Sequence, residues 1–134
     1  MTTPTDRCGR TALHYAALNN ELLEVRRLLE TDFAASAVDA AGRTPLHFAA
    51  QEYSVDAAKL LIEHGASVDA QDSYGNTPLA NAVFYSQGRG ELIKLLREAG
   101  ADPQLENKHG ISPIKLARTI ANYDLRQFFN DIPE

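Results

Sequence analysis

The sequence predicts an all-α solenoid, built from four copies of one helix–turn–helix unit with short β-turn loops. The heptapeptide TPLHFAA, which starts at Thr44, recurs as TALHYAA from Thr11, TPLANAV from Thr77 and SPIKLAR from Ser112. These starts lie 33, 33 and 35 residues apart. A period of about 33 residues with a T-P-L-H core is typical of a helical unit that repeats along a stack.

Two flanking positions keep the same phase as the heptapeptide. Asp and Asn side chains accept hydrogen bonds from nearby turn amides, and glycine permits the positive φ that tight turns need. An Asp or Asn precedes each start by five residues and a glycine precedes it by two, at Asp6, Asp39, Asp72 and Asn107 and at Gly9, Gly42, Gly75 and Gly110. Each copy therefore predicts a turn that leads directly into a helix.

The second copy shows how one unit is expected to fold. Thr44 caps a first helix, and Pro45 takes the first helical position, where its missing amide costs nothing. A turn over 52–54 leads into a second helix over 55–64, which Gly65 ends as a C-cap. Because no single unit can cover its own apolar face, the units gain stability only by stacking.

Departures from the repeat occur in the other copies. In the first copy the second helix is expected over 22–31, and an Asp-Phe pair at 32–33 replaces the glycine that usually follows. The third copy is two residues longer, most simply through the Ser-Gln pair at 86–87. The fourth copy is expected to end in a helix over 124–131 with one polar face, because a terminal unit needs a polar outer surface.

These motifs resemble those of the ankyrin-repeat family, over roughly residues 5–130. The resemblance implies a single domain over 1–134, with repeats at about 6–38, 39–71, 72–106 and 107–131. The C-terminal half, with its lengthened third copy and its ARTIANYD segment, is similar to small single-domain ankyrin proteins of bacteria. Some of those resemble immunity proteins, which bind and block the active domains of toxins.

Composition narrows the class of protein. The chain of 134 residues is 44% hydrophobic and 23% charged, which is ordinary for one globular domain. No apolar run approaches the length of about 18 residues that a membrane span needs, and residues 1–11 lack the features of a secretory signal. Cys8 is the only cysteine, which suits a reducing compartment. We therefore expect a cytoplasmic protein that does not enter membranes and is monomeric on its own.

The formal net charge of -5 bears on the kind of partner. It disfavours nucleic-acid binding, because such proteins neutralise phosphates with Lys and Arg. The same charge is compatible with steering toward a basic protein, since complementary charge raises the association rate. We expect another protein as partner, with a basic toxin domain as one candidate, and no nucleic acid.

Residues that often carry catalysis or bind metals are scattered through the sequence. His14 and His47 hold the same motif position in adjacent copies, which predicts hydrogen bonds between neighbouring units; a metal site would need further converging ligands. Cys8 has no His or Asx beside it, and the Gly-Arg-Gly at 88–90 lacks the strand and glycine spacing of a phosphate-binding loop. The sequence predicts no enzyme, no cofactor and no metal. An enzyme or ligand-binding protein that uses Cys8 or His109 is the alternative.

The surface therefore carries the functional prediction. Resemblance to the ankyrin family implies that partners contact the turn tips and the exposed side of each first helix, which together form a concave strip. By position this strip includes Arg10 from the first copy, Arg43, Gln51 and Glu52 from the second, Tyr74, Asn76, Phe84 and Tyr85 from the third, and Lys108, His109 and Ile111 from the fourth. Tyr53 and Arg89 extend it.

The third copy concentrates aromatic side chains in this strip. Tyr74, Phe84 and Tyr85 stand where the family normally shows solvent, beside the two-residue insertion. Exposed aromatic residues next to arginine are typical of interface hot spots. The alternatives are that Phe84 packs as local core in the lengthened turn, and that Arg10 and Arg43 are only solvated turn residues.

Two main functions follow from this surface. The first is inhibition of a partner protein through the concave face and turn tips, as a bacterial immunity protein inhibits a toxin domain. The second is a general scaffold or regulatory adaptor that binds endogenous proteins without abolishing an activity.

Overall fold

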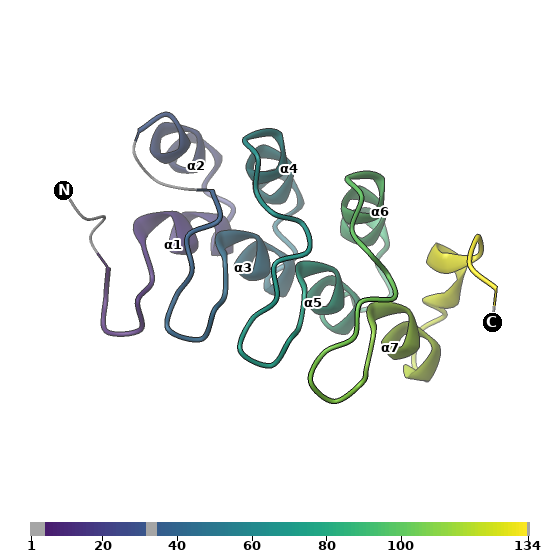
Figure 1. The fold of residues 1–134 in the computed structure, drawn as a ribbon. Helices are drawn as coiled ribbons and strands as arrows, with labels where there is room; N and C mark the ends of the chain where they lie inside the picture. The colour runs from purple at the N-terminus through teal and green to yellow at the C-terminus, as the bar shows by residue number, and fades with distance from the viewer. Residues whose placement is uncertain (1–4, 32–34, 134) are drawn as a thin grey trace.

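The computed structural model of the chain describes residues 5–31 and 35–133, and within them it contains only helices, turns and loops. The first helices of the units form one row, and the second helices form another row, above it in the view of Figure 1. The first helices are α1 (Ala12–Leu18), α3 (Pro45–Gln51), α5 (Pro78–Phe84) and α7 (Pro113–Thr119). The second helices are α2 (Leu22–Leu29), α4 (Val55–Glu63) and α6 (Glu91–Glu98), and a 3-10 helix, η1 (Arg126–Phe129), follows α7. The predicted all-α solenoid is confirmed.

Each first helix begins at a hydroxyl cap, as the heptapeptide predicts. The side-chain oxygens of Thr11, Thr44, Thr77 and Ser112 each accept a hydrogen bond from the backbone amide three residues later. Proline follows the cap in three of the four helices, where no amide is needed. These helices are short, so tertiary packing and not helix propensity keeps them folded.

The core runs along the stack between the two rows of helices. Leu13, Leu46 and Leu79 occupy the same motif position and are fully buried, and Ile114 takes that place in the fourth unit. Alanines such as Ala49 keep the backbones of neighbouring helices close. Each first helix packs against its own second helix and against the next first helix, which is the nearest-neighbour arrangement of a solenoid.

The turns project side by side beyond the row of first helices (Figure 1). In each turn, one side-chain oxygen of the Asp or Asn accepts hydrogen bonds from two backbone amides of the same turn. Adjacent turns are joined by backbone hydrogen bonds between the pairs Ala40–Cys8, Ser73–Ala41 and Lys108–Tyr74. The turns therefore form a ladder that fixes the position of each tip relative to the next.

The second helices end earlier than the sequence predicted. α2 ends at Leu29, and just beyond it the amide and the hydroxyl of Thr31 both donate to the Leu28 carbonyl. α4 ends at Glu63, and His64 is its capping residue. The Asp-Phe pair at 32–33 lies outside the described residues.

The predicted helix over 124–131 is wrong, since only the single turn of η1 forms there. Leu125 and Phe129 are buried at the end of the core, and Phe128 packs against the lengthened loop of the third unit. An added Cβ at Gly90 would come within 2.1 Å of the Phe128 ring. The segment therefore follows the shape of that loop, and a short 3-10 turn suits such a terminal piece.

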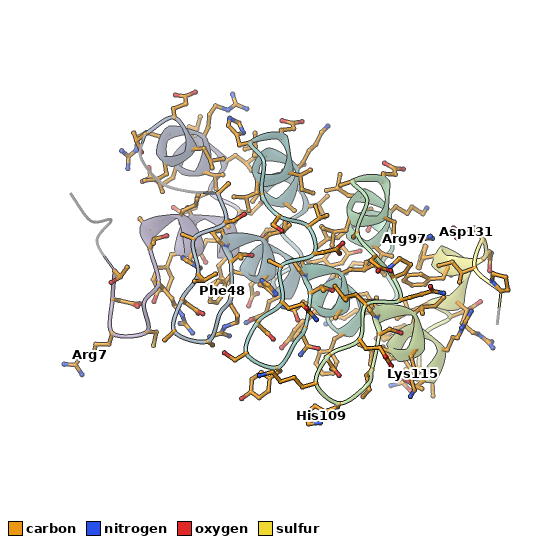
Figure 2. The ribbon with its side chains drawn as sticks, viewed as in Figure 1. Arg7, Phe48, Arg97, His109, Lys115 and Asp131 are labelled. Carbon is orange, nitrogen blue, oxygen red and sulfur yellow. The ribbon has the colours of Figure 1, made fainter. Side chains whose placement is uncertain are left out.

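A side-chain clasp fastens this C-terminal segment to α6. Arg97 donates one hydrogen bond to each carboxylate oxygen of Asp131, both at 2.7 Å, and a third to the Phe128 carbonyl at 2.9 Å. Figure 2 shows Arg97 and Asp131 together at this end of the stack. The clasp thus joins the C-terminal segment to the second helix of the third unit.

Candidate partner-binding surface

Two buried histidines connect neighbouring units, as their spacing predicts. Nδ1 of His14 and of His47 accepts a hydrogen bond from the amide of the helix cap, at 3.0 and 3.1 Å. Nε2 then carries the proton and donates to a carbonyl of the next turn, that of Arg43 at 2.9 Å and that of Asn76 at 2.8 Å. The prediction of hydrogen bonds between neighbouring units is therefore confirmed for both.

Burial lowers the pKa of both histidines. At His47, burial disfavours the protonated ring and outweighs the hydrogen bond to Asn76 and the charge of Asp72, which favour protonation. At His14, burial outweighs the corresponding hydrogen bond to Arg43. Both rings are therefore neutral in the folded chain at neutral pH.

We expect the free energy of unfolding to fall as the pH is lowered from about 7 to about 5. The unfolded chain binds protons at both histidines near the ordinary pKa of about 6.5, whereas the folded chain does not until the pH is lower. The stabilisation is complete above the unfolded pKa and declines below it. Urea denaturation at both pH values measures this decline. A double variant, H64Q/H109Q, alters only exposed histidines and should keep it; a stability that is constant or rises toward pH 5 would contradict the expectation.

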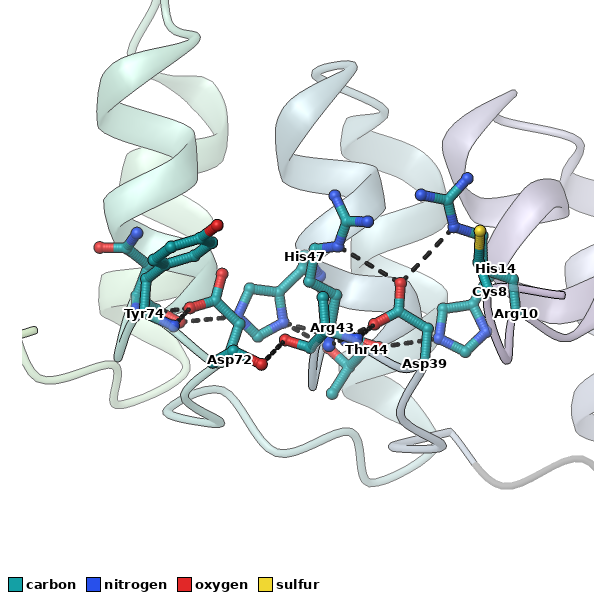
Figure 3. Close-up of polar contacts among 12 residues, drawn as sticks. Cys8, Arg10, His14, Asp39, Arg43, Thr44, His47, Asp72 and Tyr74 are labelled. Atoms are coloured by element: carbon teal, nitrogen blue, oxygen red, sulfur yellow. Dashed lines mark hydrogen bonds and ion pairs between the residues drawn. The ribbon is translucent and has the colours of Figure 1, made fainter. Parts of the chain in front are cut away.

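Arg10 and Arg43 are tied to the turn carboxylate of Asp39. Their Nε atoms lie 3.5 and 3.3 Å from the same Asp39 oxygen, and both guanidinium groups lie over the Phe48 ring. Burial by itself would raise the pKa of Asp39. The hydrogen bonds from the amides of Arg43 and Ala41 and the charge of Arg43 outweigh burial and lower this pKa, so the carboxylate stays ionised. Figure 3 shows both guanidinium groups on one side of Asp39. The two arginines are thus half-buried parts of a structural cluster.

Tyr53 and Arg89 form a second structural pair, at the loops between first and second helices. The guanidinium carbon of Arg89 lies 4.0 Å from the centroid of the Tyr53 ring, and its Nε donates to the Ser86 carbonyl at 2.8 Å. The Tyr53 hydroxyl accepts a hydrogen bond from the Leu92 amide at 3.2 Å. These contacts join the second unit to the third. Glu52 is exposed beside them.

Two adjoining hollows lie on either side of α5. Hollow A, about 270 Å³, faces α7 and is lined by Asn76, Ala80, Asn81, Phe84, Tyr85, Asn107, Ile111, Ser112 and Leu116. Hollow B, about 320 Å³, faces α3 and is lined by Ala41, Arg43, Gln51, Asp72, Tyr74, Asn76, Asn81 and Tyr85. Asn76, Asn81 and Tyr85 line both hollows, which together are called the α5 groove below.

The α5 groove contains the exposed aromatic side chains of the third unit. Tyr74 is 63% exposed, Phe84 is 64% exposed and Tyr85 is 40% exposed. Phe84 and Tyr85 meet edge to face, with ring centroids 4.9 Å apart. The alternative in which Phe84 is local core does not agree with this exposure. Of the other candidates, Arg43 and Asn76 also line the groove.

Lys108 and His109 lie outside the α5 groove. Both side chains are exposed at the turn tip of the fourth unit, as Figure 2 shows for His109. Arg10, Glu52, Tyr53 and Arg89 are also absent from the lining of the two hollows. The predicted residues are therefore divided between the groove, the turn tips and the helix–helix loops.

Hollow A exists because the third unit has alanine where the first two have histidine. His47 fills the space between its own cap and the next turn, and donates to the Asn76 carbonyl. Ala80 holds the equivalent position and Ile111 is the equivalent acceptor, but no imidazole bridges them. Without a ring at this position, the space beside Ala80 is part of hollow A.

Several groove residues were not among those predicted from the sequence, and Asn81 and Leu116 are two of them. Both occupy the fifth position of the heptapeptide, where the second unit has the buried Phe48. Asn81 is half-buried, and its Nδ2 donates to the His47 carbonyl at 3.4 Å. A signal was present, because an amide replaces the Tyr or Phe that the first two copies carry there.

Metal-ligand clusters and membrane spans were sought in the described parts of the chain. Within 5–31 and 35–133, no three His, Cys, Asp or Glu side chains gather in a metal-binding arrangement. Cys8 is exposed at a turn. Over the same residues, no helix has both the length and the apolar composition to cross a membrane.

Comparison with known proteins agrees with the repeat structure. Residues 2–72 and 25–107 match the family described as Ankyrin repeats (3 copies). A search of curated proteins gave no match. The matched segments together cover well over half of the chain, and the helix pairs and linked turns are those the family resemblance implied. The chain belongs to the ankyrin-repeat family.

Proposed function

We propose that this protein binds a folded protein partner in the α5 groove and inhibits it, as a bacterial immunity protein inhibits a toxin domain. Ankyrin repeats generally mediate protein–protein interaction. The observation that carries the proposal is the group of exposed aromatic side chains, Tyr74, Phe84 and Tyr85, around two hollows. Aromatic residues at the centre of an interface commonly supply most of the binding free energy.

Charge and chemistry favour an inhibitor with a basic partner. The net charge of -5 raises the rate of encounter with a basic domain. Blocking a toxin requires a fitted surface and no catalytic group, and the groove supplies such a surface. The protein would act in the cytoplasm as a monomer until its partner binds. A stable complex of this kind should bury roughly 1,200–2,000 Å² in total.

Replacing Tyr85 by alanine should weaken partner binding by about 2 kcal/mol and leave the melting temperature nearly unchanged. The ring is 40% exposed and packs edge to face with Phe84, so its loss removes contact area for the partner but little core. Calorimetry with the partner, captured from the native lysate, measures the affinity. Tyr123→Ala is the control, since that ring is 44% exposed and lies outside the groove. Equal affinity of Y85A and the parent would remove Tyr85 from the interface.

A second variant tests hollow A without removing any exposed side chain. Ala80→His restores the imidazole that bridges the other units, so it should fill the hollow and stabilise the fold while it weakens binding.

Growth of cells that co-express the protein with a toxic neighbouring gene product separates the inhibitor from the adaptor. Rescue by the parent and not by Y85A supports the inhibitor, whereas binding without rescue supports an adaptor.

A further inference from the structure

Hollow B contains a turn carboxylate, that of Asp72, between exposed tyrosines and side-chain amides. We propose that this hollow receives the guanidinium group of an arginine on the protein partner. The inference rests on the proposed function, because both concern the α5 groove. It goes further by naming the chemical group that the partner presents.

The equivalent carboxylates of the first two units are already occupied. One oxygen of each accepts the amides of its own turn, and the second oxygen has a side-chain partner. In Asp6 this second oxygen accepts a hydrogen bond from the Tyr15 hydroxyl. In Asp39 it faces the guanidinium groups of Arg10 and Arg43. These pairs show what the position binds within the chain itself: a phenol or a guanidinium.

Asp72 differs from both. Its Oδ1 accepts the amides of Tyr74 and Asn76, each at 2.9 Å. Over the described residues, Oδ2 has no hydrogen-bond donor and no cation within ion-pair distance, and Asp72 lines hollow B. Figure 3 shows this carboxylate next to the Tyr74 side chain. Asp72 is half-buried as a residue, and a carboxylate oxygen that has no donor within the chain can accept charge-assisted hydrogen bonds from a cation outside it.

Other lining groups suit a guanidinium. The Nδ2 of Asn81 points to the His47 carbonyl, which leaves Oδ1 as an acceptor, and the Gln51 amide has no hydrogen bond among the described residues. The Tyr74 and Tyr85 rings are exposed on the walls. A guanidinium carries five donors in one plane and stacks on aromatic faces, whereas an ammonium is a compact, strongly hydrated charge.

Among the residues that the structure describes, Arg43 is the one cation that lines hollow B, and it opposes an incoming arginine. Its Nε lies 3.3 Å from the buried Asp39 carboxylate, and its guanidinium carbon lies 4.9 Å from the centroid of the Phe48 ring. Asp39 offsets part of the charge of Arg43, because Arg10 shares the same carboxylate oxygen. The acceptor side of the hollow is formed by Asp72 and the two amides.

The test uses the full chain and a capped arginine, N-acetyl-arginine methylamide, followed by amide proton–nitrogen NMR at low ionic strength. Saturable shifts are expected at the backbone amides of Tyr74 and Asn76 and the side-chain amides of Gln51 and Asn81. Asp72→Asn should weaken binding about tenfold, because a charge-assisted hydrogen bond is lost. This variant should fold normally, since Asn107 supports the same turn in the fourth unit.

Matched probes and variants decide the outcome. Glu63→Gln removes the same charge from an exposed position at the end of α4, and it should change the affinity by less than about twofold. Arg43→Gln should tighten binding by removing a like charge. Equal shifts with the neutral isostere N-acetyl-citrulline methylamide, an equal response to capped lysine, or unchanged binding in D72N would overturn the arginine assignment. The Tyr85 test of partner binding would still stand in that case.

Discussion

Replacing His47 by alanine should lower the free energy of unfolding by about 3–4 kcal/mol. The ring is fully buried, so its removal leaves a cavity between the second and third units. The Thr44 amide loses its acceptor at 3.1 Å, and the Asn76 carbonyl loses a donor at 2.8 Å. Since small domains are stable by only about 5–15 kcal/mol, the loss is a large part of the total. Urea denaturation followed by circular dichroism measures it.

The loss of stability should depend on where the histidine lies in the fold, and not on the removal of a histidine as such. His109→Ala is the control, because that side chain is exposed at a turn tip and its loss should stay within about 0.5 kcal/mol. The bridge joins two units of a stack held by nearest-neighbour contacts, so H47A should also reduce the cooperativity of unfolding. If H47A lost less than about 1 kcal/mol of unfolding free energy, the histidine bridge would be dispensable at this junction. The junction at Ala80 already lacks such a bridge.

Features that recur in two or more copies could be predicted from the sequence. The caps at Thr44 and its equivalents depend on contacts within three residues, and repetition makes their spacing visible. The histidine bridge spans 29 residues, from His47 to Asn76, but it also repeats, in the pair His14 and Arg43. Periodicity thus turned a tertiary contact into a sequence signal.

Features that occur once could not be predicted in the same way. The lengthened loop of the third unit and the C-terminal segment pack on each other, through Gly88 against Tyr123 and Gly90 against Phe128. Each looked irregular alone, and the expected helix over 124–131 ignored the loop that shapes it. Contacts between distant, unrepeated segments leave no periodic trace in one sequence.

The candidate surface was predicted only in part, because some of its features depend on contacts that do not repeat. Exposure of Tyr74 and Phe84 follows from their repeat positions, and the structure agrees. The stacking of Arg89 on Tyr53 joins an insertion to a different unit, so position within the repeat did not indicate it. Hollow A depends on the substitution of one histidine by Ala80, whose effect appears only when the next turn is in place.

Replacing Gly75 by alanine should cost about 3 kcal/mol of unfolding free energy, because two effects add. The residue has a φ of +82°, a conformation that costs any residue with a Cβ about 1–2 kcal/mol. A Cβ here would also lie 2.9 Å from the Asn107 Cα and from the Lys108 nitrogen. These atoms belong to the backbone of the next turn, which is held by the Lys108 amide donating to the Tyr74 carbonyl at 3.0 Å. Neither turn can move without breaking the ladder.

Gly100→Ala separates the two effects. That glycine has a φ of +96°, but its added Cβ would meet nothing within 4 Å, so only the conformational cost applies. We expect Gly100→Ala to cost about 1–2 kcal/mol, and the difference between the two variants measures how rigidly neighbouring turns are fixed. Equal losses would mean that the turns yield easily. A turn ladder that yields could not hold Asp72 and the tyrosines in place before a partner binds, so the same comparison tests whether the α5 groove is preformed.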